Sequence, residues 1–153
     1  MYNDTVTLFN RRAGRSGSTW YATVLHNVNL SVDRASILAK YGAASQDNAV
    51  LNVRYEFRGG DEKIIEGKPW LPPKEWHAQN DDMMPETVTF TAGDGYDFFM
   101  LGEGDGASVI YDKDYSSDGG FYGYMNKTRD YVFAVTSVSG PFTLIPHFEI
   151  TGK

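Results

Sequence analysis

The chain has 153 residues, no cysteine, a formal net charge of −6 and a hydrophobic fraction of 41%. This length predicts one domain with a real core, and the hydrophobic fraction excludes a disordered acidic tail. The lack of cysteine excludes disulfides, thiolate zinc sites and cysteine nucleophiles. No run approaches the roughly 18 apolar residues that span a bilayer. Residues 1–12 lack the apolar core of a signal peptide, so we expect a cytoplasmic protein without a membrane partner.

The charge is distributed unevenly along the chain. Residues 94–118 contain seven acidic residues and one lysine, a net charge of −6 that equals the charge of the whole chain. Residues 1–60 contain seven Lys and Arg residues against four acidic ones. An acidic stretch of this kind does not bind DNA phosphates through counterion release, so it would repel DNA or meet a basic partner.

The first part of the chain predicts a β-hairpin. Thr5–Phe9 alternates polar and apolar residues, and Thr19–Leu30 is rich in β-branched and aromatic residues, so both segments favour strands. The glycines and serines of Arg11–Ser18 predict the turn between them. This turn makes a basic tip that we predict to contact a partner, through Arg11, Arg12 and Arg15.

The middle of the chain contains a short helix candidate and the clearest strand pattern. Asp33–Gly42 fits a helix, although a loop is nearly as compatible with so short a pattern. Asn48–Phe57 alternates regularly and predicts a strand. We expect its core face to be formed by Leu51, Val53, Tyr55 and Phe57.

The second half predicts further strands around one more helix. Pro73 suits the first turn of a helix through Gln79, with Trp70 and Trp76 packed on the sheet. The later segments expected to form strands are 86–103 as strand, turn and strand, 129–140, and 144–151 bent at Pro146. The whole predicts a single all-β domain over residues 1–153, a small barrel or sandwich of about seven strands with one or two short helices. Residues 102–126 are expected to form a long, mobile, acidic inserted loop.

The inserted loop raises the question of a metal site. Asp112, Asp114, Ser116 and Asp118 alternate like the first ligands of a calcium loop. Such a loop needs a glycine at its sixth position and a glutamate at its twelfth, where this chain has Ser117 and Gly123. Surface turns have the same composition for backbone reasons, so a solvated loop without a metal is favoured.

Other chemistry is weakly supported. None of the three histidines has a second histidine at ligand spacing, and there is no nucleophile elbow or phosphate-binding loop. We therefore predict no catalytic residue, cofactor or metal, and a protein that is not an enzyme. The alternative class is an acidic β-sandwich that binds glycan or protein. Its candidate aromatic face comprises Trp20, Trp70, Trp76 and the cluster 121–125.

The order of these segments resembles the small head-completion proteins of tailed bacteriophages. These are the stopper or minor capsid proteins that join head to tail, and the similarity is to versions from phages and prophages of Gram-positive bacteria. The segments that carry the resemblance are DTVTLFNRR, TWYATVLHNVNL, YGAASQDNAVLNVRY, KPWLPPKEWHA, ETVTFTAGDGYDFFMLGE, VFAVTSVSG and IPHFEITGK. They cover nearly the whole chain, and His147 lies near the end as in the family.

The resemblance implies a virion structural protein that assembles in the bacterial cytoplasm. It implies a small β-barrel that forms a homo-oligomeric ring between portal or adaptor and tail proteins, with DNA passing nearby without specific binding. We then expect the inserted loop to line or close the DNA channel, or to contact a neighbouring ring. The acidic residues assigned to this role are Glu103, Asp105, Asp112, Asp114 and Asp118.

Overall fold

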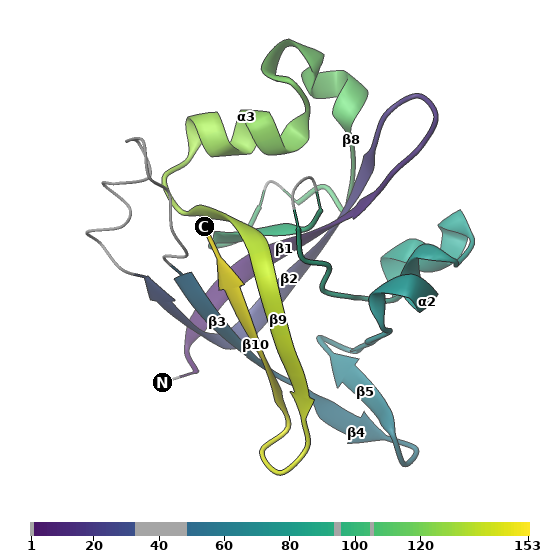
Figure 1. Ribbon diagram of the computed structural model, residues 1–153, viewed down its shortest axis with the longest axis vertical. Helices are drawn as coiled ribbons and strands as arrows, with labels where there is room; N and C mark the ends of the chain where they lie inside the picture. Colours follow the sequence, from purple (N-terminus) through teal and green to yellow (C-terminus); the bar gives the residue numbers. More distant parts are fainter. Residues whose placement is uncertain (1, 33–48, 94–95, 105) are drawn as a thin grey trace.

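The computed structural model describes residues 2–32, 49–93, 96–104 and 106–153 (Figure 1). The helix candidate Asp33–Gly42 therefore lies outside the described residues, as do Asp94 and Asp105. Among the helices that are described, none is long and apolar enough to cross a membrane.

Six antiparallel strands close into a barrel in the order β1-β7-β9-β10-β3-β2, and the pairing of β1 with β2 completes the circle. The barrel strands are β1 (Asp4–Arg12), β2 (Thr19–Val32), β3 (Ala49–Arg54), β7 (Phe98–Leu101), β9 (Val132–Phe142) and β10 (His147–Gly152). A further strand, β8 (Val109–Tyr111), pairs with the beginning of β2 outside the barrel. The predicted small all-β fold is confirmed, and of the two expected forms, barrel or sandwich, it is a barrel.

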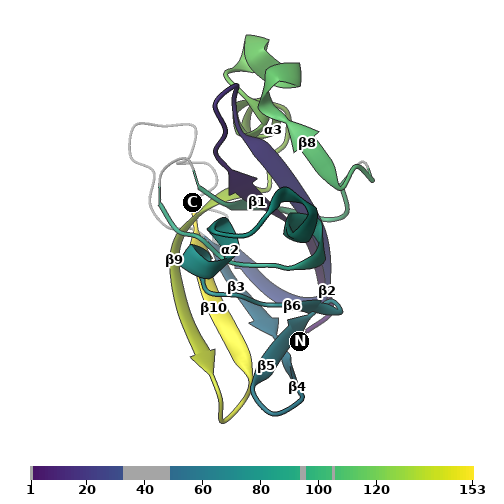
Figure 2. The same ribbon diagram turned by 90° about the vertical axis from the view of Figure 1, so that its right-hand side faces the viewer.

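A small second sheet and short helices flank the barrel (Figures 1 and 2). The second sheet consists of β4 (Glu56–Arg58), β5 (Glu62–Ile65) and β6 (Lys68–Pro69). The helical segments are α2 (Pro73–His77), η1 (Asp81–Glu86), η2 (Asp112–Asp118) and α3 (Phe121–Thr128), of which η1 and η2 are 3₁₀ helices. The predicted helix that starts at Pro73 is confirmed, with Trp76 fully buried.

The barrel interior is filled by one apolar cluster, and every strand of the barrel contributes side chains to it. On β3 and the residue after it, Leu51, Val53 and Tyr55 are buried as the alternation predicts. Phe57 was expected on the same face but is 45% exposed. It lies on β4, which leaves the barrel to pair with β5, so the strand pattern does not continue across Tyr55.

The segment before β7 differs from the predicted strand–turn–strand. Val88 and Phe90 are buried as the alternation predicts, but residues 87–92 form a single bridge, between Val88 and Trp70, in place of a ladder. The Val88 amide donates to the Pro69 carbonyl at 3.0 Å, so this extended segment is held beside the proline-rich stretch. Regular pairing starts only at Phe98.

Candidate interaction surfaces

The acidic segment 102–126 is folded onto the barrel. It contains β8, η2 and the first part of α3, where a loop was expected. Phe121 and Met125 of α3 are buried against Phe9, Trp20 and Phe98 in a second apolar cluster. The spacing of four residues between Phe121 and Met125 places them on one helix face, and this was the sequence signal for the helix. We name residues 102–128 the acidic cap.

Asp112 holds the acidic cap to the barrel. One carboxylate oxygen accepts a hydrogen bond from the Trp20 indole nitrogen at 2.6 Å and another from the Phe121 amide at 2.9 Å. The second bond satisfies a free N–H at the start of α3, and the first reaches across to β2. Asp112 therefore has a structural role in this fold, in addition to its place in the acidic segment.

Replacing Asp112 with alanine should lower the free energy of unfolding by about 2–4 kcal/mol, because two buried or half-buried donors lose a charged acceptor. Asp114→Ala is the matched control: Asp114 lies two residues away on the same 3₁₀ helix and its side chain is exposed, so a change below about 0.5 kcal/mol is expected. Urea unfolding of both variants measures the difference. Equal effects would show that Asp112 does not fasten the cap.

The remaining acidic residues of the cap differ in their surroundings. Asp118 forms an ion pair with Lys127 at 3.3 Å, whereas Asp114 is exposed to solvent. Glu103 lies near His26, and Asp105 is outside the described residues. Within the described residues, no group of three or more acidic or histidine side chains is arranged to hold a metal ion. The alternating acids of the calcium-like motif lie along η2, and Asp112 is already bound to Trp20 and Phe121.

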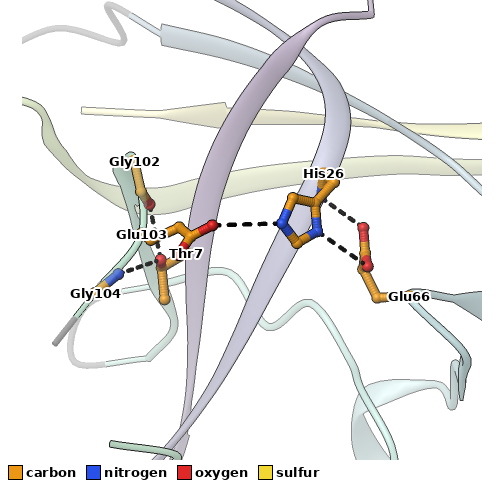
Figure 3. A network of polar contacts seen from close by, with 6 residues as sticks. All are labelled: Thr7, His26, Glu66, Gly102, Glu103 and Gly104. Atoms are coloured by element: carbon orange, nitrogen blue, oxygen red, sulfur yellow. Dashed lines mark hydrogen bonds and ion pairs between the residues drawn. The ribbon is translucent and has the colours of Figure 1, made fainter. Parts of the chain in front are cut away.

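His26 links two acidic residues from distant parts of the chain (Figure 3). Its ring nitrogens lie 3.3 Å from the Glu66 carboxylate and 3.6 Å from the Glu103 carboxylate, and its amide donates to Glu66. His26 precedes Asn27, which has a left-handed φ of 55°, at an irregularity in the pairing of β1 with β2. The irregularity turns the imidazole toward both acids, an arrangement that sequence spacing did not reveal.

Thr7 fixes the chain on either side of Glu103 (Figure 3). Its hydroxyl donates to the Gly102 carbonyl at 2.8 Å and accepts from the Gly104 amide at 3.0 Å. Both bonds join β1 to the start of the acidic cap, so the Glu103 backbone is anchored beside the barrel.

The pKa of His26 is raised, first by its hydrogen bond to Glu66 and then by the charge of Glu66, with smaller contributions from Glu103. We expect nuclear magnetic resonance titration to give a His26 pKa above 6.5, lowered more by Glu66→Gln than by Glu103→Gln. The stabilisation that goes with a raised folded-state pKa is complete at pH values below the pKa of the unfolded chain. It is lost as the pH rises through the pKa of the folded chain. Equal pKa values in the wild type and Glu66→Gln would contradict this.

The three arginines of the predicted basic tip have different surroundings. Arg12 donates to the Gln79 carbonyl at 2.8 Å and lies 3.3 Å from the Asp81 carboxylate, so it ties the hairpin to η1. The Arg11 side chain lines a surface cavity of about 400 Å³ together with Lys74 and His77. Arg15 is exposed in the turn. The structure therefore separates the three arginines, and Arg12 is occupied within its own chain.

Asp97 is a buried carboxylate that sequence analysis placed in the acidic segment. It accepts hydrogen bonds from the Asn10 amide group at 2.8 Å, the Arg11 backbone at 2.9 Å and the Thr91 backbone at 2.7 Å. Burial raises its pKa to about 7, and the three hydrogen bonds oppose that rise. Asp97 joins β1 to the segment before β7, so its role is in the fold.

The aromatic residues proposed for glycan binding are mostly inside the protein. Trp20 and Trp76 are buried, and Phe121 and Met125 belong to the second cluster. Trp70 packs on Phe148 with ring centroids 4.8 Å apart. Trp70, Tyr122 and Tyr124 are half-buried, so most of the candidate aromatic face is used in packing.

The most exposed large apolar side chains lie at the tip of the β9–β10 hairpin. Leu144 is 96% exposed, Ile145 is 67% exposed and Phe142, beside them, is 42% exposed. Figure 1 shows this hairpin projecting from the barrel at the end away from the acidic cap. We name residues 142–145 the apolar tip. An unbroken apolar pair in a turn, where polar residues are usual, was the sequence signal for it.

The comparisons with known proteins give a family without an assigned activity. The chain matches, over residues 1–153, a family described as Family of unknown function (DUF6751). The chain belongs to this family. No curated protein matches the chain, and neither does any solved structure. The function of this DUF6751 member must therefore be argued from its own surfaces.

Proposed function

We propose that this DUF6751 chain is a structural subunit of the head–tail connector of a tailed bacteriophage. In this proposal it forms a stopper-like ring between the portal or adaptor and the tail proteins, as the sequence resemblance implies. The proposal requires surfaces that bind other protein chains and does not require a reaction at any side chain.

The apolar tip is the observation that carries the proposal. Leu144 is almost completely exposed, Ile145 is mostly exposed, and Phe142, whose ring stacks on His147, is partly exposed. Contact of this surface with water is unfavourable in an isolated chain and favourable once a neighbour covers it. The tip lies on a paired hairpin, β9 with β10, so it is presented on a regular support. Such a surface is expected on a subunit that functions in an assembly, where a neighbouring chain covers it.

The packed barrel supports the same role. The interior cluster fills the space between the strands, with side chains such as Phe133 and Phe148 fully buried. Small barrels of this kind are filled by their own side chains and present their outer surface for binding. Binding to other proteins through the outer surface is consistent with this construction.

The acidic cap supplies a negative surface that suits a DNA channel. Asp114 is exposed, and the Glu103 side chain is 66% exposed. Carboxylates on a channel wall repel the phosphate backbone, so that DNA slides without binding. The bonds of Asp112 and the buried face of α3 hold the cap on the barrel. We therefore propose a fixed acidic lining, or a fixed contact with the next ring, in place of a moving gate.

The assembly of the purified chain tests the proposal. Analytical ultracentrifugation should show concentration-dependent oligomers, and electron micrographs should show rings with a central opening. The same images are taken after a candidate portal or adaptor protein has been added, since such a neighbour provides the platform on which a ring assembles. A chain that stays monomeric alone and with these partners would contradict the proposal.

A further inference from the structure

We propose that the apolar tip of one copy docks in an apolar pocket between the barrel and the acidic cap of the next copy. This inference rests on the proposed function, because it names the contact that would join the subunits of the ring.

The pocket lies on the outer face of β1 and β2, under the acidic cap. Its volume is about 210 Å³. The apolar side chains that line it are Phe9, Ala22, Val24, Ile110, Phe121 and Met125. Ala107 and Ser108 line its rim and are exposed. The pocket is therefore bounded by the barrel on one side and by β8 and α3 on the other.

The pocket and the tip fit each other in size and chemistry. A dry cavity of roughly 150 Å³ with apolar walls holds a benzene molecule. A volume of about 210 Å³ is therefore enough for the side chain of Leu144, with Ile145 against the rim. The small side chains of Ala22 and Ala107 leave this space open, since larger residues there would fill it.

The two surfaces lie at different ends of the molecule. In both views the β9–β10 hairpin projects at one end of the long axis and the acidic cap lies at the other (Figures 1 and 2). A chain cannot place its own tip in its own pocket with this geometry. A contact between two different patches is heterologous, and it repeats from copy to copy until the rotation between subunits closes a ring.

The charge near the pocket is compatible with an uncharged tip. Residues 140–146 carry no charged side chain, whereas Glu103 lies beside the pocket, next to its lining residue Gly104. The tip therefore brings no carboxylate to an acidic rim. The chain as a whole carries −6, so two copies repel each other at long range. Salt screens that repulsion and leaves apolar contacts in place, so association should strengthen between low and physiological ionic strength.

Disulfide trapping tests the contact directly, because the chain has no cysteine of its own. Leu144→Cys and Ala107→Cys are made in one chain, which is oxidised gently and separated on a non-reducing gel. We expect a ladder of covalent multimers, since a disulfide forms only where the two Cβ atoms approach to about 4 Å. The control pairs Ala107→Cys with Asp61→Cys, which is exposed between β4 and β5 near the same end as the tip.

A mixing experiment tests the direction of the contact. Leu144→Asp can receive a tip but cannot donate one, and Ala22→Phe, with its pocket filled, can donate but cannot receive. Each variant alone should be monomeric, and an equal mixture should give dimers that grow no further. Circular dichroism confirms the fold of each variant, and Val24→Phe is a second pocket-filling variant. Leu144→Asp chains that assemble like the wild type, or a mixture that stays monomeric, would overturn the inference.

The outcomes separate this inference from the proposed function. Wild-type rings with cross-linking no higher than in the Asp61→Cys control would overturn the docking of tip in pocket and leave the connector proposal standing. This result is also expected if the tip binds a different phage protein. Specific cross-linking in a chain that forms only open filaments would support the docking and argue against a ring.

Discussion

Asp97→Ala should lower the free energy of unfolding by about 2–4 kcal/mol, because one buried and two partly buried N–H donors lose their acceptor at once. The donors belong to Asn10, Arg11 and Thr91, so the loss loosens β1 and the segment before β7 together. Urea unfolding measures the effect against Asp114→Ala, an exposed acid whose loss should change little. A loss below about 1 kcal/mol would show that Asp97 does not organise this part of the fold.

The pKa of Asp97 also gives a pH dependence with a definite sign. Burial raises its pKa from 3.8 to about 7, so the folded chain holds a proton at pH values where the unfolded chain has released it. Its contribution to stability is therefore complete below about pH 4, decreases as the pH rises toward 7, and then stays constant. In Asp97→Asn this decrease should be absent. An unchanged pH profile in Asp97→Asn would contradict the raised pKa.

Leu144→Asp should abolish self-association while leaving the free energy of unfolding unchanged. Burying a leucine side chain contributes roughly 1.5–3 kcal/mol, and a tenfold change in affinity corresponds to about 1.4 kcal/mol. Removing that contribution should therefore weaken association by roughly 10- to 150-fold, and the added charge should weaken it further. The side chain is 96% exposed in the single chain, so folding does not depend on it.

Leu144→Met is the matched control for this variant, because it keeps an apolar side chain of similar volume at the tip. It should assemble nearly as the wild type does in sedimentation experiments across a range of concentrations. If Leu144→Asp and Leu144→Met assemble equally well, the apolar tip does not join the subunits.

The strands of the barrel could be predicted from the sequence because a strand with one face in the core alternates apolar and polar residues. Leu51, Val53 and Tyr55 alternate and are buried. The same rule failed at Phe57, because a local pattern does not tell where a strand leaves one sheet for another. The acidic segment was predicted as a loop because of its many charged residues. The spacing of Phe121 and Met125, which are buried on one face of α3, was not used as evidence for a helix.

The candidate surfaces were harder to predict, because each depends on residues that are distant in the chain. His26 meets Glu66 and Glu103 only after an irregular strand pairing has turned its side chain toward both. Asp112 was grouped with the other acids by composition, yet its contact with Trp20 gives it a different role. Residues 144–151 were predicted to form one strand, but Leu144 and Ile145 lie in the turn before β10, so the apolar tip was not predicted.

The connector proposal predicts that the gene for this chain lies in a phage or prophage genome, and disrupting it there tests the proposal most directly. After induction, electron micrographs of the lysate should show heads and tails that are not joined, and supplying the wild-type gene in trans should restore joined particles. Complementation with Leu144→Asp should fail, while Leu144→Met should succeed. Joined, infectious particles in the absence of the gene would contradict the account.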